Sequence, residues 1–145
     1  MKHLQTEIII DAPAEEIWTQ LMDFDAYHQW NPFIQSIVSS GDLAVANRIT
    51  AVIKPGDKKA QTFKPVVKAL EPNKELRWLG SASIKGIFDG EHYFILEEMA
   101  PNQTRFLHGE RFSGILVGLV MRMIGDDTLK GFEAMNVALK KRCEG

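Results

Sequence analysis

The sequence predicts an α+β fold in which an antiparallel β-sheet wraps around one long C-terminal helix. Two observations carry this prediction. Residues 34–112 form a run of apolar segments separated by turn-forming residues, which is typical of antiparallel hairpins. Beyond residue 115, apolar residues recur every three or four positions, which is typical of a long amphipathic helix. A sheet with one apolar face must cover that face, and this helix is the only predicted element long enough.

The N-terminal part is expected to form one strand followed by a short helix. Residues 4–10 are the expected strand. Pro13 suits the first position of a helix, because that position needs no backbone N–H. Glu15 and Glu16 place negative charge at the positive end of the helix dipole. One face of the helix carries Ile17, Trp18 and Leu21 at helical spacing.

The segment DFDAYHQWNPFI, residues 23–34, is more aromatic than a connecting loop requires. We expect a second short helix here, which Pro32 ends because the residue before a proline avoids helical backbone angles. Tyr27, Trp30 and Phe33 recur every three residues, so they share one side of this turn. Two interpretations stay open: a lid in which Trp30 and Phe33 touch a ligand, and a plug that closes the core.

Seven strands are expected in total. Turn residues separate the later ones: Lys54-Pro55-Gly56-Asp57 predicts a type II turn, and two further turns are expected at residues 71–74 and 100–103. Gly86 and Gly90 fall inside the sixth strand and are expected to mark β-bulges. The expected strands are residues 4–10, 34–39, 48–53, 62–70, 76–79, 84–97 and 104–112.

The C-terminal helix is expected from about residue 127 onward, and the residues before it are left open. Gly125 and Gly131 each cost about 1 kcal/mol relative to alanine in a helix interior. They therefore indicate a kink, a delayed helix start or close packing. The apolar residues 115–121 are open to three interpretations: helix, cavity lid or interaction surface. One stripe of the helix carries Gly118, Met121, Gly125, Thr128, Phe132, Met135 and Leu139.

The candidate polar groups lie on the last hairpin. A turn centred on Pro101-Asn102 places His92 opposite Glu110 and Phe94 opposite His108. Because strand side chains alternate, these residues share an inward face that is otherwise aromatic. Three interpretations stay open: a satisfied cross-strand pair, groups that orient a ligand in an apolar cavity, and an acid–base pair. The outer face, expected to meet solvent, carries Glu91, Tyr93, Glu97, Arg105 and Arg111.

Composition argues against several functions. The net charge of −2 gives no long-range attraction to nucleic acid. Cys143 is the only cysteine and the histidines lack ligand spacing, so no metal is expected, and the absence of a glycine-rich phosphate loop leaves no expected cofactor. The longest apolar run, residues 115–121, is far shorter than the roughly 20 residues that span a bilayer. With no signal-peptide pattern, we expect a cytoplasmic protein without an integral membrane segment.

The ordered set of segments resembles the SRPBCC superfamily, the START-like and birch-pollen-allergen-like group, and is most similar to its polyketide cyclase/dehydratase-like branch. These segments are APAEEIWTQLMDFDAYHQWNPFI, PGD followed by FKPVV, LRWLG, FDGEHYFILEE, TRFLHGERFSG and FEAMNVALKKR. The resemblance implies a single domain over residues 1–145 with the helix-grip fold. In that fold a seven-stranded antiparallel sheet grips the C-terminal helix, two short helices follow the first strand, and an apolar cavity lies between sheet and helix.

The resemblance and the residues together predict binding, transport or sequestration of a small hydrophobic molecule in that cavity. One alternative is a cyclase/dehydratase-like enzyme that uses His92, Glu110 and His108 in acid–base chemistry. A second is a protein-interaction or co-chaperone module. The residues expected to line the cavity are Trp30, Phe33, Trp78, Phe88, His92, Phe94, Phe106, His108, Glu110, Phe112, Met121, Thr128, Phe132 and Met135.

Overall fold

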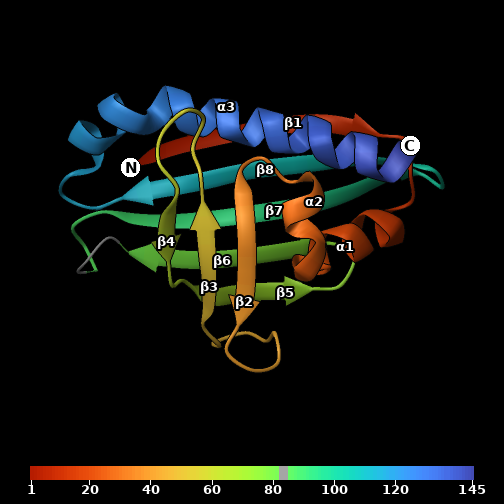
Figure 1. The fold of residues 1–145 in the computed structure, drawn as a ribbon, viewed down its shortest axis with the longest axis horizontal. Coiled ribbons are helices and arrows are strands. Elements are labelled where there is room, and N and C mark those ends of the chain that lie inside the picture. The colour runs from red at the N-terminus through yellow and green to blue at the C-terminus, as the bar shows by residue number, and fades with distance from the viewer. Residues whose placement is uncertain (82–84) are drawn as a thin grey trace.

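In the computed structural model, one long helix lies against an antiparallel sheet, which confirms the predicted α+β fold (Figure 1). The structure describes residues 1–81 and 85–145. Five antiparallel strands form the larger sheet, in the order β1–β8–β7–β6–β5. Their bounds are Lys2–Ile10 for β1, Val66–Glu71 for β5, Glu75–Ser81 for β6, Asp89–Ala100 for β7 and Gln103–Ser113 for β8.

A second sheet of three strands corrects the predicted strand count. The single strand expected over residues 62–70 is divided at Pro65, which has no N–H to give to a ladder. The described residues therefore hold eight strands rather than seven. The backbone N–H of Ile49 donates to the Pro65 carbonyl at 3.0 Å and links the two sheets. The smaller sheet has the order β2–β3–β4, with bounds Ile34–Ser39, Ile49–Ile53 and Gln61–Phe63.

The two short helices lie where the sequence predicts them. α1 (Ala14–Met22) begins directly after Pro13, and a 3₁₀ turn, η1 (Phe24–Ala26), leads into α2 (Tyr27–Trp30). The Asn31 side chain ends α2, because its Oδ1 accepts the backbone N–H groups of the two residues that enter β2. Those donors belong to Phe33, at 3.0 Å, and Ile34, at 2.9 Å.

The C-terminal helix α3 (Val117–Glu144) covers the expected residues from 127 onward, also includes the ten residues before them, and runs through Gly125 and Gly131 without interruption. Of the three explanations for its glycines, Gly131 corresponds to close packing. A Cβ atom there would overlap with the ring of Phe33, so the missing side chain forms the notch that receives this ring.

Two predicted details of the loops are wrong. The turn in the β3–β4 connection is closed by the N–H of Lys58, which donates to the Pro55 carbonyl at 3.0 Å. It therefore spans residues 55–58 rather than 54–57, although Gly56 has the positive φ expected of it, +55°. Gly86, with φ +95°, lies in the turn before β7 rather than in a strand.

The sixth predicted strand, residues 84–97, starts later than expected. Residue 84 lies outside the described residues, and β7 begins at Asp89. Gly90 marks no bulge, because the register irregularity between β7 and β8 lies between Glu98 and Ala100. Gly90 instead lies under the carboxyl group of Glu110, where a Cβ atom would overlap with Oε2. The role of this glycine is therefore close approach of a side chain.

One face of the larger sheet is covered by α3, α1 and the smaller sheet. Figure 1 shows α3 extending along β1 and β8, while β2, β3 and β4 cross the other strands. The smaller sheet belongs to the same core, because Ile37 and Ala51 join one buried cluster with Leu76 and Phe94. Within the described residues, none of the helices combines the length and apolarity needed to cross a bilayer.

The outer face of the larger sheet differs from the prediction at Tyr93. This side chain was expected in solvent, but only 2% of the residue is exposed. Its ring lies over Gly109, the guanidinium carbon of Arg77 lies 4.8 Å from its centroid, and its hydroxyl lies 2.7 Å from Nε2 of His3. Side chains from β6 and β1 and the backbone of β8 therefore bury Tyr93.

Candidate functional site

The register of the last hairpin is the one that the sequence predicts. His92 pairs with Glu110, Phe94 with His108, and Leu96 with Phe106. His92 and His108 are 2% and 0% exposed, whereas 19% of the Glu110 side chain is exposed. The three polar side chains therefore gather on the inward face.

These side chains belong to one hydrogen-bonded series, which we call the buried polar chain: Glu110, His92, His108, Asn136 and Thr6. Glu110 Oε1 lies 3.1 Å from His92 Nδ1, and His92 Nε2 lies 2.8 Å from His108 Nε2. His108 Nδ1 lies 2.9 Å from Asn136 Oδ1. Asn136 Nδ2 donates to Thr6 Oγ1 at 2.7 Å, and the Thr6 hydroxyl donates to the His108 carbonyl at 3.0 Å. The chain thus joins α3, β1, β7 and β8.

The direction of each hydrogen bond follows from the Asn136 end. Thr6 gives its one hydroxyl proton to a carbonyl, so Asn136 uses its NH₂ on Thr6 and turns its oxygen toward His108. His108 Nδ1 must then carry a proton, and a neutral His108 accepts at Nε2 from His92. A neutral His92 in turn accepts at Nδ1, so the Glu110 carboxyl must be protonated and donate.

Burial favours this uncharged arrangement. Loss of water raises the pKa of Glu110 to about 8 and lowers the pKa of His92 to about 3. The pKa of His108 is held well below its usual value by burial and by its neighbour His92. At neutral pH these three groups therefore carry no net charge.

Aromatic rings enclose the two imidazoles. Trp78 stacks on His92 with ring centroids 4.8 Å apart and planes 8° apart, and the centroid of the Phe33 ring lies 6.2 Å from that of His92. Phe132 stacks on His108 at 4.3 Å. These contacts account for the desolvation and leave almost no part of the imidazoles exposed to solvent.

Most residues predicted to line a cavity contact one another in this interior. Of the two interpretations of segment 23–34, the packing of Phe33 in its notch and of Tyr27 beneath Trp30 corresponds to the plug. Thr128 and Met121 are buried on α3, 5% and 7% exposed. For the interior residues a role in ligand contact stays a prediction: Trp30, Phe33, Trp78, Phe94, Phe106, Phe132 and Met135.

Sequence reasoning missed Asn136 and Thr6, which complete the polar chain. Asn136 lies four residues after Phe132, at the edge of the apolar stripe of α3, and is only 2% exposed. The sequence signal that could have identified Asn136 is an amide side chain at helical spacing from the apolar residue Phe132. Its partner Thr6 lies 130 residues away, and sequence spacing gives no information on such a pair.

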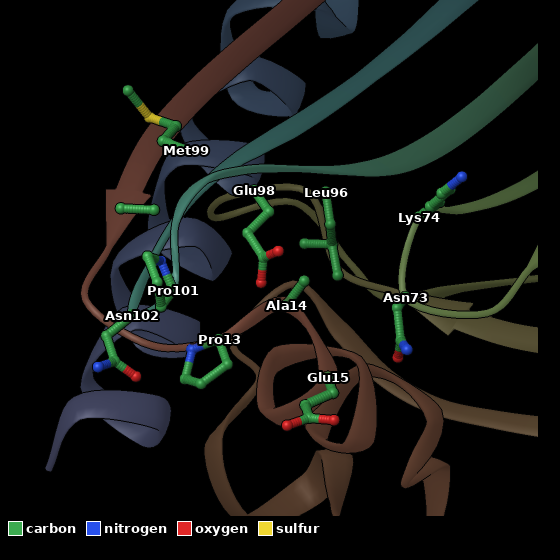
Figure 2. A pocket seen from close by; sticks show the side chains of 11 residues that line it. Pro13, Ala14, Glu15, Asn73, Lys74, Leu96, Glu98, Met99, Pro101 and Asn102 are labelled. Atoms are coloured by element: carbon green, nitrogen blue, oxygen red, sulfur yellow. The ribbon is translucent and has the colours of Figure 1, made fainter.

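A wide surface groove lies away from the polar chain. It has a volume of about 820 Å³ and lies between the start of α1, the β5–β6 turn and the end of the β7–β8 hairpin. Figure 2 shows Leu96 and Glu98 of β7 facing Pro13 and Ala14 across it. Its lining combines residues of β7, the start of α1 and two turns and is of mixed polarity, and no member of the polar chain is among the lining residues.

A smaller cleft at the other end of the structure is predominantly apolar. This apolar cleft has a volume of about 430 Å³ and lies where the β3–β4 connection meets the first turns of α3. An ion pair between Lys58 and Asp127, 3.7 Å long, joins these two elements. The lining residues are Pro55, Lys58, Gln61, Phe63, Ile87, Phe88, Leu116, Val120 and Ile124.

The apolar cleft and the polar chain are connected by two stacked rings. Phe88, a predicted site residue, lines the cleft and stacks on Phe112 with centroids 5.5 Å apart and planes 15° apart. Phe112 is the next inward-facing residue of β8 after Glu110. Glu110 is therefore the polar-chain member that lies nearest the cleft along the strand.

The apolar run 115–121 contributes to the same region. Its residues from Val117 onward form the start of α3, which answers the question of whether it is helical. Leu116 and Val120 face the cleft, whereas Ile115 and Leu119 are exposed, by 79% and 59%.

The long helix held by an antiparallel sheet, with two short helices after the first strand, defines a helix-grip protein. The model of the family "Polyketide cyclase / dehydrase and lipid transport" matches residues 1–144, so the chain belongs to this family of the SRPBCC superfamily. No curated protein sequence matches the chain.

Solved structures with the same fold include proteins of different activity. The Zhui aromatase/cyclase from Streptomyces sp. R1128 has a TM-score of 0.79 at 12% identity, covering 99% of this chain and 93% of that one. A START superfamily protein from Mycobacterium smegmatis has 0.70 at 21%, covering 98% and 97%. Norcoclaurine synthase from Thalictrum flavum has 0.73 at 14%, covering 98% and 93%. At these identities the similarity establishes the fold.

Proposed function

We propose that this protein binds a small molecule with an apolar body in the apolar cleft. The observation that carries the proposal is the composition of the cleft. Phe63, Phe88, Val120 and Ile124 contribute apolar side chains from three separate parts of the chain, and Lys58 supplies a polar group. Small-molecule sites commonly combine such an apolar lining with few polar groups, in volumes of about 300–1,000 Å³.

The polar chain supports binding more than catalysis. A general acid must present its proton to the substrate. The proton of Glu110 is directed at His92, away from the cleft, and both imidazoles are enclosed by rings. The polar chain therefore fixes the position of the Glu110 carboxyl group rather than offering a proton to a substrate. The cyclase/dehydratase-like activity named in the family description would require this proton to be redirected.

The test uses N-phenyl-1-naphthylamine, an uncharged probe that becomes fluorescent in apolar surroundings. We expect saturable binding near one-to-one. Val120→Trp, which fills the cleft, should weaken binding at least tenfold, whereas Leu119→Trp on the exposed side of the same helix should change it less than twofold.

Ile124→Trp is a second blocking variant, in case Val120→Trp lowers stability. Circular dichroism checks the fold of all three variants. An absence of probe binding, or binding that neither blocking variant weakens, would contradict a ligand site in the apolar cleft.

A further inference from the structure

We propose that the ligand of the apolar cleft carries a neutral hydroxyl group, a phenol or an alcohol, that donates a hydrogen bond to Oε2 of Glu110. The inference rests on the proposed function and names the chemical class of its ligand. Three observations support it: the proton arrangement of the polar chain, the position of Oε2, and the charges around the site.

The proton arrangement leaves Oε2 as an acceptor. The protonated Glu110 donates through Oε1 to His92 Nδ1, so Oε2 is the carbonyl oxygen of the carboxyl group. If the proton moves to His92, the carboxylate again has only lone pairs at Oε2. In both arrangements the oxygen accepts hydrogen bonds, so the matching ligand group must be a donor.

Oε2 is also accessible. The described residues give it no hydrogen-bond partner, and 19% of the Glu110 side chain is exposed. Gly90 provides the space in which this oxygen lies, since any side chain there would overlap with it. An acceptor in this position is costly to leave without water or a ligand donor.

The cleft and Oε2 are within reach of one small molecule. Glu110 and Phe112 are two residues apart on β8, which corresponds to about 7 Å along a strand. Phe112 contacts Phe88 at the cleft wall. A molecule with two fused rings that rests against Phe88 spans a similar distance, so its hydroxyl can approach Glu110 while its rings stay in the cleft.

The surrounding charges favour a neutral donor over a charged one. Among the described residues, no lysine or arginine is buried beside Glu110, so a ligand carboxylate would lack a partner there. Lys58 at the cleft is already paired with Asp127. The uncharged polar chain likewise offers no net negative charge to a buried ammonium group.

Two ligands that differ in one donor test the proposal. We expect 2-naphthol to bind the unmodified protein at least tenfold more tightly than 2-methoxynaphthalene, which keeps the rings and oxygen but lacks the O–H. Isothermal titration calorimetry measures both affinities. In Glu110→Met, which cannot accept the hydrogen bond, this preference should fall below twofold.

Glu110→Gln is the matched control. Its NH₂ can donate to His92 and its carbonyl oxygen can accept from the ligand, so we expect the preference to persist. Equal affinities for the two ligands in the unmodified protein would overturn the hydroxyl inference while the binding function stands. Failure of both ligands and of the naphthylamine probe would overturn the binding function itself.

Discussion

Gly90 on β7 and Glu110 on β8 lie so close that a side chain on the glycine would occupy the position of Oε2. The two residues are not direct partners in the ladder: Gly90 pairs with Phe112, and Glu110 with His92. The Glu110 carboxyl group therefore extends beyond its own ladder pair and lies over Gly90 on the adjacent strand. This relationship sets both the hydrogen bond of Glu110 to His92 and the position of its second oxygen, Oε2, over Gly90.

Gly90→Ala should displace the Glu110 carboxyl from His92. The loss of a partly buried hydrogen bond predicts a fall in unfolding free energy of about 1–3 kcal/mol, measured by urea denaturation. Gly118→Ala is the control, because no atom outside its own helix backbone lies within 4 Å of its Cβ position. Equal stabilities of the two variants would show that the Glu110 carboxyl is held elsewhere.

Gly131→Ala should be destabilising, and Gly125→Ala should not, although both glycines lie in α3. The new methyl group at residue 131 collides with Phe33, and such overpacking costs about 1–3 kcal/mol. At residue 125 the nearest neighbour is Met121 Cε at 3.6 Å, so helix propensity should dominate and add up to about 1 kcal/mol. Thermal denaturation of the two variants measures both changes in stability. A stabilised Gly131→Ala protein would mean that Phe33 does not fill this notch.

In a certain pH range Glu110 is ionised in the unfolded chain but stays protonated in the folded protein. As the pH rises through this range, the unfolding free energy should fall. That range extends from the ordinary pKa of 4.5 to the folded pKa of about 8. Below pH 6.5 the histidines act in the opposite direction, because unfolded His92 binds a proton that folded His92 resists until about pH 3. The effect of Glu110 is thus unopposed by His92 between pH 6.5 and 8.

Glu110→Gln should remove this alkaline decline, whose slope for one proton is at most about 1.4 kcal/mol per pH unit. Glu97→Gln, at a side chain that is 50% exposed, should leave the decline unchanged. Denaturation curves at half-unit intervals from pH 6.5 to 8 provide the measurement. A decline that persists in Glu110→Gln would assign the titration to another group.

The inward face of the functional hairpin could be predicted from the alternation of apolar residues, and the predicted pairs are the observed ones. The turn alone does not give these pairs: it pairs Ala100 with Gln103, and that register continued without a shift would place His92 opposite Arg111. The irregularity between Glu98 and Ala100 supplies the shift of one residue that places His92 opposite Glu110. The fold followed from the same kind of local evidence, one hairpin after another.

Features that depend on distant parts of the chain could not be predicted. The burial of Tyr93 needs Arg77 from β6 and His3 from β1. The notch at Gly131 needs a ring that comes 98 positions earlier, from Phe33. The predicted aromatic residues were assigned to the inward face, but periodicity does not tell whether inward rings line a space or fill it. Only the packing against Phe132 answers that.

Amide chemical shifts recorded by NMR during a titration with 2-naphthol test the account most directly, because they locate the ligand. We predict that the largest changes gather at residues 87–90, 110–112 and 116–124, which border the apolar cleft and Glu110. Changes that gather instead at residues 13–15, 73–74 and 96–102, around the groove of Figure 2, would contradict the assignment of the ligand to the apolar cleft.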